Sequence, residues 1–190
     1  MLSSEVQLQS GDGLLVVDVQ RDFLPGGSLA VRDGDAVVPP LNDWIARFAT
    51  AGAPIFATRD WHPADHCSFR PQGGPWPAHC VAGTPGAAFA DGLALPEGVA
   101  VVSKAMRDDD AYSGFERTDL HERLQRASVQ RLFVGGLATD YCVLNSVLDA
   151  RHLGYAVVLL TDCIRAVEVQ PGDGARAIAT MLAAGAVALG

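Results

Sequence analysis

The chain has 190 residues, of which 49% are hydrophobic and 19% are charged, and its formal net charge is -8. This size and composition predict a single soluble domain over residues 1–190, with residues 1–12 as a flexible N-terminal segment. The acidic charge excludes the clustered Lys and Arg of a nucleic-acid-binding surface, so a small molecule is the expected partner.

The sequence also bears on compartment and assembly. No stretch reaches the ~18 consecutive apolar residues of a membrane span, and the N-terminal residues lack the basic and apolar regions of a signal peptide. We therefore expect a cytoplasmic protein without a membrane partner. In that reducing compartment its four cysteines would be free thiols. A homo-oligomer is possible.

Apolar runs and helical periodicity alternate along the first third of the chain. A continuous apolar run over residues 13–17 predicts a strand covered on both faces, with Asp18 at its carboxyl end. Apolar residues at i, i+3, i+4 and i+7 over residues 41–48 predict a helix. The next predicted strand spans residues 54–58, and Asp60 lies just beyond it.

A long irregular segment follows. Residues 61–98 contain most of the prolines and two of the three tryptophans, without sustained periodicity. They predict a long ordered loop, and such loops in compact domains are usually functional. A strand over residues 99–102 then ends near Lys104, and a short amphipathic helix opens at Asp119.

Strands and helices continue to alternate in the second half. The predicted elements are a strand over residues 130–134, a helix around Cys142, a strand over 155–160, and a final helix over 174–184 before the apolar run 187–189. This alternation predicts a doubly wound, mainly parallel α/β sheet with helices on both faces. Ligands of such folds bind outside the carboxyl ends of the strands.

Cys142 lies where a buried strand should turn into a helix. Thr139 or Asp140 can cap that helix, which would place the thiol in its first turn beside unpaired N–H groups. Helix N-termini and nearby cations lower a thiol pKa from about 8.5 to roughly 3.5 to 7.5. We therefore interpret Cys142 as a nucleophile, and the alternative is an unreactive thiol that packs as a small apolar group.

Asp18 and Lys104 should emerge at the same sheet edge as Cys142. A thiol nucleophile needs a base that takes its proton, and Asp18 at a strand end could serve. Lys104 would be the cation that stabilises thiolate and carboxylate. The ordinary alternatives are a turn residue for Asp18 and a surface charge for Lys104.

A second group of side chains has the composition of a metal site. Asp60 and His62 follow the end of a strand, and His79 could complete the set from the returning loop. A carboxylate with two imidazoles suits zinc, iron or manganese and leaves positions for water or substrate. The alternatives are histidines satisfied by hydrogen bonds, or a closed structural zinc site that adds Cys67 and Cys80 to the two histidines.

Several motifs occur in an order that is typical of one family. They are Asp18-Val19-Gln20-Arg21-Asp22-Phe23, Gly26-Gly27-Ser28-Leu29, Asp60-Trp61-His62-Pro63, Trp76-Pro77-Ala78-His79-Cys80-Val81, Tyr112-Ser113-Gly114-Phe115 and Gly136-Leu137-Ala138-Thr139-Asp140-Tyr141-Cys142-Val143. The sequence resembles the nicotinamidases (pyrazinamidases) of the isochorismatase-like cysteine hydrolases, over residues 14 to about 185.

The resemblance implies an enzyme that hydrolyses nicotinamide to nicotinate and ammonia in NAD salvage, and that also cleaves pyrazinamide. In this family pattern Cys142 attacks the carboxamide carbon, Asp18 transfers protons, and Lys104 holds the pair electrostatically. Backbone N–H groups of Ala138 and Cys142 would form the oxyanion hole, and the Leu137–Ala138 bond would be cis.

The resemblance further implies a divalent metal that receives the pyridine nitrogen of the substrate. Zinc is the first expectation, with iron or manganese as alternatives. Asp60, His62 and His79 would be ligands, and His66 is a further candidate. The implied substrate-binding walls are Phe23, Leu29, Trp76, Tyr112, Leu137 and Tyr141.

Two other functions are compatible with the sequence. One is a related cysteine hydrolase that acts on another amide or on isochorismate, although metal-free relatives would not need the Asp60, His62 and His79 set. The other is a non-catalytic, metal-stabilised binding module in which Cys142 only packs. The second predicts no turnover and no unusual thiol reactivity.

Overall fold

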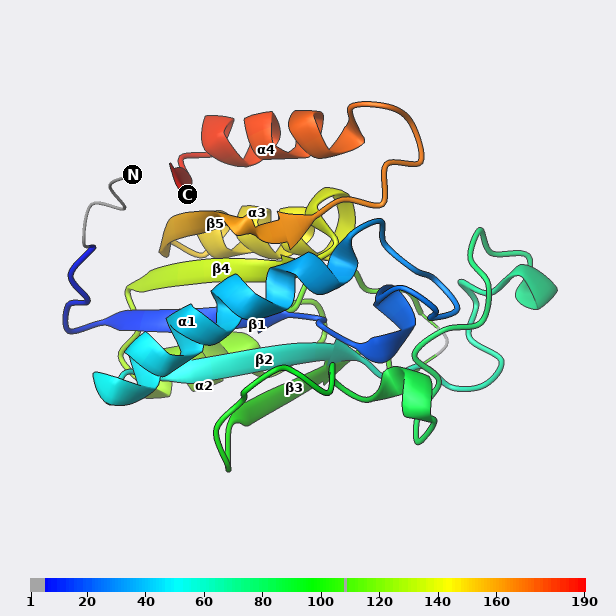
Figure 1. Ribbon diagram of the computed structural model, residues 1–190, viewed down its shortest axis with the longest axis horizontal. Coiled ribbons are helices and arrows are strands. Elements are labelled where there is room, and N and C mark those ends of the chain that lie inside the picture. Colours follow the sequence, from blue (N-terminus) through cyan, green and yellow to red (C-terminus); the bar gives the residue numbers. More distant parts are fainter. Residues whose placement is uncertain (1–5, 108) are drawn as a thin grey trace.

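The computed structural model describes residues 6–107 and 109–190 and contains one six-stranded sheet with helices on both sides (Figure 1). The strand order is β3-β2-β1-β4-β5-β6, and every pair is parallel. The strands are β1 Asp12–Val17, β2 Ile55–Asp60, β3 Ala100–Lys104, β4 Arg131–Leu137, β5 Ala156–Arg165 and β6 Val187–Leu189. The predicted doubly wound α/β fold is confirmed.

The direction of winding reverses at the middle of the sheet. From β1 the chain proceeds outward through β2 to β3, and it then returns to place β4 on the other side of β1. A crevice therefore opens between the carboxyl ends of β1 and β4, which is the ligand-binding position in open α/β sheets.

The helices cover both faces as the periodicity predicted. Their bounds are α1 Val38–Thr50, α2 Leu120–Arg126, α3 Leu144–His152 and α4 Asp173–Ala183. No helix in the described ranges is long and apolar enough to cross a membrane. One core, here called the α1-side core, includes Leu14, Phe48 and Phe133. The opposite face forms the α3-side core, which includes Leu15 and Val147.

β4 and β5 extend furthest beyond their predicted ends. β4 continues through the expected hinge at residues 135–136, and β5 runs past its predicted end at residue 160. Gly136 permits this close packing because its φ is +135° and a Cβ there would lie 2.0 Å from the Val17 carbonyl oxygen. The glycines therefore let β4 lie tightly against β1 rather than end the strand.

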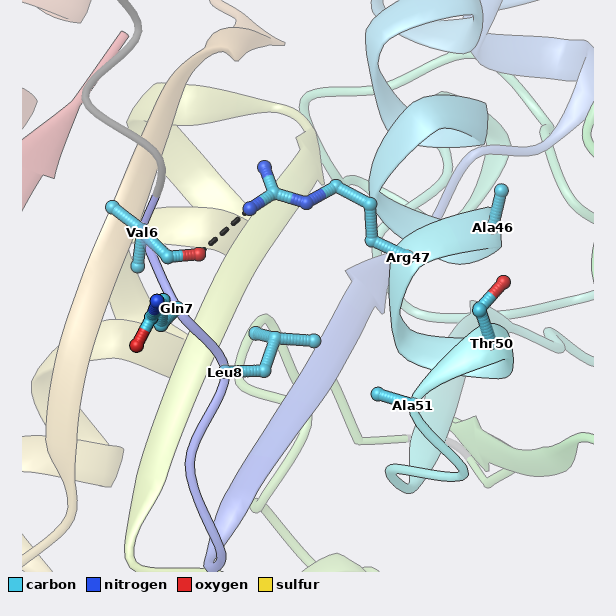
Figure 2. Close-up of a pocket in the computed structure, with 7 residues that line it drawn as sticks. All are labelled: Val6, Gln7, Leu8, Ala46, Arg47, Thr50 and Ala51. Atoms are coloured by element: carbon cyan, nitrogen blue, oxygen red, sulfur yellow. Dashed lines mark hydrogen bonds between the residues drawn. The ribbon is translucent and has the colours of Figure 1, made fainter.

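The N-terminal segment packs on the domain from residue 6. The Val6 carbonyl accepts a hydrogen bond of 2.7 Å from Arg47 Nη2 on α1, and Leu8 packs against the α1-side core (Figure 2). Strand β1 already begins at Asp12. Of the segment predicted to be flexible, residues 1–5 lie outside the described residues, Val6 and Leu8 pack on the domain, and Asp12 belongs to β1.

The long segment between β2 and β3 is irregular, as predicted. It contains two short 3-10 turns, Arg70–Gln72 and Pro85–Ala87. Isolated bridges join His62 to Val81 and Phe69 to Trp76. These pairings bring the beginning of the segment back beside its middle, at the carboxyl edge of the sheet.

Candidate active site

Three neighbouring strands deliver charged side chains to one buried point. Asp18 follows β1, and Asp60 and Lys104 are the last residues of β2 and β3, which are paired directly with one another. Cys142 follows β4. All four are buried, with exposed fractions of 0% for Asp18 and 2% for Lys104. The crevice between β1 and β4 therefore contains the predicted catalytic residues.

Lys104 bridges this cluster. Its Nζ lies 3.0 Å from Asp18 Oδ2 and donates hydrogen bonds to Asp60 Oδ1, to the Ala111 carbonyl at 3.2 Å, and to Cys142 Sγ at 3.4 Å. A buried ammonium needs such partners because desolvation disfavours its charge. The alternative in which Lys104 is a surface charge is wrong.

The two carboxylate oxygens of Asp18 have different partners. Oδ1 accepts a hydrogen bond of 2.7 Å from Thr58 Oγ1, whereas buried Oδ2 forms the ion pair with Lys104 Nζ at 3.0 Å and accepts no hydrogen bond. Ligand atoms of Asp18, Asp60 and Cys142 lie within 4.8 Å of one another. Asp18 therefore has an unused lone pair beside the thiol, which is the arrangement that a base for Cys142 requires.

Burial sets the charge state of the cluster. It raises the pKa of Asp18 and of the Cys142 thiol, and nearby Lys104 opposes both effects. Burial also lowers the pKa of Lys104, but the carboxylates of Asp18 and Asp60 raise it well above its ordinary value. Burial therefore favours the protonated thiol, whose proton a base must remove during attack, and it opposes the effect of the helix N-terminus expected from the sequence.

The turn that carries Cys142 differs from the predicted helix start. Residues Thr139–Val143 form a π-helical turn ahead of α3, without a side-chain cap. Asp140 instead accepts hydrogen bonds from the backbone N–H groups of Val167 and Glu168, at 2.9 and 3.0 Å. The predicted cap is wrong because this carboxylate faces a neighbouring loop. The Leu137–Ala138 bond is cis, as the resemblance implied.

Asp60, His62 and His79 form a compact group with metal-ligand composition. Their candidate ligand atoms lie within 4.8 Å of one another, and all three residues are buried. Asp60 Oδ2 is 3.6 Å from His62 Nε2, while its other oxygen binds Lys104. One carboxylate thus links this group to the ammonium beside Cys142.

The hydrogen bonds of the histidines fit a divalent metal. His62 Nδ1 is 3.2 Å from the Ala105 carbonyl, and His79 Nδ1 is 2.8 Å from the Pro77 carbonyl. Each Nδ1 can donate there, which leaves Nε2 with a lone pair. His62 Nε2 is buried without a hydrogen-bond partner. Burial lowers the pKa of His79 and favours its neutral, ligating form.

His66 lies beside this group with partners of its own. Its ring centroid is 4.2 Å from that of His62. His66 Nδ1 is 2.8 Å from Ser68 Oγ, and Nε2 is 3.3 Å from the Asp109 carbonyl. These contacts align the ring next to the triad, and its role as a fourth ligand stays a hypothesis.

The alternative zinc site with two cysteines does not form. Within residues 6–107 and 109–190, neither Cys67 nor Cys80 joins a cluster of metal-ligating atoms. The Cys80 side chain packs in the α1-side core, and burial raises the pKa of this thiol far above its usual range. A protonated thiol buried among apolar groups is a poor zinc ligand.

Zinc binding should depend on His79. We expect His79→Ala to weaken zinc affinity by more than about 100-fold, because changes to outer hydrogen-bond partners alone cost about 10- to 100-fold. Equilibrium dialysis against zinc with elemental analysis measures this. His121→Ala, on α2 beside Tyr155, should bind zinc as the wild type does. Equal affinity of the two variants would exclude His79 as a ligand.

A narrow cavity connects Asp60 and His79 of the candidate metal-binding group with Cys142. Its walls are mostly aromatic and apolar. The lining residues are Phe23, Leu29, Asp60, Trp76, His79, Tyr112, Ala138, Tyr141, Cys142 and Val167. Trp76 Nε1 donates a hydrogen bond of 3.1 Å to Tyr112 Oη, and both rings pack near Tyr141. A flat aromatic ligand fits between such walls.

The cavity lining lacks one residue that the resemblance implied and includes one that the sequence reasoning missed. Leu137 does not reach it, because this last residue of β4 is fully buried in the α1-side core. Val167, which the sequence reasoning missed, lines the cavity from the loop after β5. The available signal was topological: this loop also follows a strand at the carboxyl edge.

The combination of a doubly wound sheet with a cysteine, a carboxylate and an ammonium at its switch point defines the class of α/β cysteine hydrolases. A family model described as Isochorismatase domain matches residues 12–189. The chain therefore belongs to the isochorismatase family.

Named relatives refine this placement. A nicotinamidase from Escherichia coli (strain K12) is 40% identical over 195 residues, covering 91% of this chain and 92% of its own. A pyrazinamidase of Pyrococcus horikoshii in complex with zinc is 47% identical with a TM-score of 0.90, covering 94% and 98% of the two chains. PnC1 from L. infantum in complex with nicotinate is 38% identical with a TM-score of 0.86, covering 97% and 95%.

Proposed function

We propose that this protein is a metal-dependent nicotinamidase that hydrolyses nicotinamide to nicotinate and ammonia. The observation that carries the proposal is the aromatic-walled cavity, which has Cys142 at one position and the Asp60 and His79 side chains at another. A pyridine ring with a carboxamide substituent can present its nitrogen to a metal held by Asp60, His62 and His79, and its carbonyl carbon to the Cys142 thiol. The similarity to a nicotinamidase and to a nicotinate complex supports this substrate.

The resident metal is proposed to be zinc. Asp60, His62 and His79 would hold it, and their two imidazoles and one carboxylate suit zinc while leaving open positions. The zinc-bound relative supports this choice over iron or manganese. When bound, the metal supplies a Lewis acid that receives the ring nitrogen and so orients the substrate.

In the proposed reaction, Asp18 takes the proton of the Cys142 thiol as the sulfur attacks the carboxamide carbon. The resulting tetrahedral oxyanion is met by the backbone N–H groups of Ala138 and Cys142. Collapse breaks the C–N bond, and the nitrogen leaves as ammonia with the proton from Asp18. A thioester on Cys142 is left behind.

Water then completes the cycle. Asp18 takes a proton from the attacking water, the C–S bond breaks, and that proton passes to the sulfur; the carboxylic acid product loses its remaining proton to solvent and becomes nicotinate. Lys104 stays protonated throughout and stabilises negative charge on either Asp18 or the sulfur, both of which its Nζ contacts. The proposed reaction belongs to the salvage of the pyridine ring for NAD, in the cytoplasm.

Substrate analogues distinguish a ring-anchoring site from a general amidase. We expect pyrazinamide to be cleaved, because it keeps a ring nitrogen in the same position relative to the carboxamide. Benzamide has a carbon there and should lose at least about 100-fold in kcat/KM, because an unpartnered polar site rejects such analogues strongly. Ammonia release at several substrate concentrations gives the ratio.

The same measurement separates the rival hydrolases. A related enzyme for aliphatic amides would release ammonia from acetamide as efficiently as from nicotinamide. A kcat/KM for benzamide comparable to that for nicotinamide would contradict the proposed anchoring of the ring nitrogen.

A further inference from the structure

The loop between β5 and α4 contributes a wall of the cavity without being part of the proposed chemistry. In Figure 1 it is the orange segment at the end of the sheet to which the strand arrows point. Val167, on this loop, lines the same cavity as Cys142 and Tyr141. Its β-branched side chain is stiff, so the position of this wall follows the position of the backbone.

That backbone is held by the turn that carries the nucleophile. The two carboxylate oxygens of Asp140 each accept one hydrogen bond, Oδ1 from the Val167 N–H and Oδ2 from the Glu168 N–H. Charge-assisted bonds of this kind are stronger than neutral ones. Asp140 lies two residues before Cys142, so one short turn positions both the thiol and the wall.

The rest of the loop is pinned independently. Glu168 has a left-handed backbone, with φ +57°, and its side chain accepts hydrogen bonds from the N–H groups of Gly172 and Gly174, both at 2.7 Å. Asp173 accepts one from the Gln170 N–H at 2.7 Å. These contacts tie the loop to the start of α4, whereas Asp140 ties it to the cavity.

We propose that Asp140 is a positioning residue that sets the distance of Val167 from Cys142, and that Val167 thereby limits which ring substituents the cavity accepts. The substrate class is pyridine carboxamides with a small or absent ring substituent. This inference rests on the proposed function for its substrate, but the contact between Asp140 and the loop is independent of it.

The preference for nicotinamide over ring-methylated substrates tests whether Val167 limits ring substituents. With nicotinamide and its ring-methylated isomers as substrates, Val167→Ala should raise the kcat/KM of at least one methylated isomer relative to nicotinamide by about tenfold, since one methyl group is worth about 10- to 200-fold in a tight pocket. Asp140→Asn should change the kcat/KM ratio of the same isomer in the same direction, because the asparagine amide nitrogen would face a backbone N–H donor in place of an accepting oxygen. Asp173→Asn is the matched control and should keep the wild-type ratio.

A second readout does not depend on turnover. Hydrogen exchange at the Val167 and Glu168 amides should become about tenfold faster in Asp140→Asn, because one of the two charge-assisted bonds is replaced by a repulsive contact. In Asp173→Asn these two amides should exchange as in the wild type.

The outcomes separate the two proposals. Unchanged exchange at both amides in folded Asp140→Asn would overturn the positioning role, whatever the enzyme hydrolyses. Faster exchange with an unchanged selectivity ratio would overturn the role of Val167 as a limit on ring substituents. If Asp140→Asn does not fold, the ratio of kcat/KM values in Val167→Ala alone decides whether Val167 limits ring substituents. Absence of any nicotinamide turnover by the wild type, with faster exchange in Asp140→Asn, would refute only the proposed substrate.

Discussion

Replacing Cys142 with alanine is expected to lower kcat for nicotinamide hydrolysis by roughly 10⁴- to 10⁶-fold, since removal of a nucleophile leaves only binding and oxyanion stabilisation. The thiol is 5% exposed, lies 3.4 Å from Lys104 Nζ and faces the cavity, so alanine removes the reacting atom with little change in packing. Ammonia release from zinc-loaded protein is the measurement.

Cys163→Ala is the matched control. This cysteine is also buried, but it belongs to the α1-side core, and burial raises the pKa of its thiol to about 12. We expect wild-type turnover from this variant. Undiminished ammonia release by Cys142→Ala would show that another group attacks the amide and would remove the reason to interpret this site as that of a cysteine hydrolase.

Asp18→Asn should lower kcat by about 10²- to 10⁴-fold, which is the usual contribution of a general acid or base. Asparagine can still accept the hydrogen bond from Thr58 Oγ1, but it cannot take the thiol proton at the second position. Zinc binding should persist because Asp60, His62 and His79 are unchanged. Single-turnover and steady-state rates together locate the loss in the chemical steps.

The opposite end of the same strand offers a control. Asp12 is also a buried carboxylate of β1, and it accepts hydrogen bonds of 2.7 Å from both Nε and Nη2 of Arg131. Asp12→Asn should lower the melting temperature because it weakens a partly buried ion pair, while kcat stays near that of the wild type. If both variants lost stability and activity in parallel, Asp18 would be a structural residue rather than the base.

Much of the fold was predictable because local signals and tertiary structure agree. The uninterrupted apolar run of β1 predicted a strand covered on both faces, and it lies at the centre of the sheet. Because parallel strands end at a common edge, the polar residue after β1 and those at the ends of β2 and β3 could be assigned to one site. Asp18, Asp60 and Lys104 do lie together there.

Errors arose where neighbours in sequence are not neighbours in the site. Leu137 was expected near the ring from the resemblance, but it does not line the cavity, and its fully buried side chain packs in the α1-side core. Thr139 or Asp140 was expected to cap a helix, but no side chain caps the turn, and the partners of Asp140 are the N–H groups of a loop that follows a different strand. Sequence periodicity does not specify such long-range pairing.

The sequence alone determined the order of strands and helices, the chemical types of the site residues, and their location at strand ends, because these depend on local patterning and on the common direction of parallel strands. Tertiary structure decided the surroundings of the Cys142 thiol, because burial raises its pKa and the adjacent Lys104 opposes this effect. It also decided that Val167 forms a wall, since only packing brings the loop after β5 against the turn after β4. Both depend on desolvation and contact between segments far apart in the chain, which no local pattern encodes.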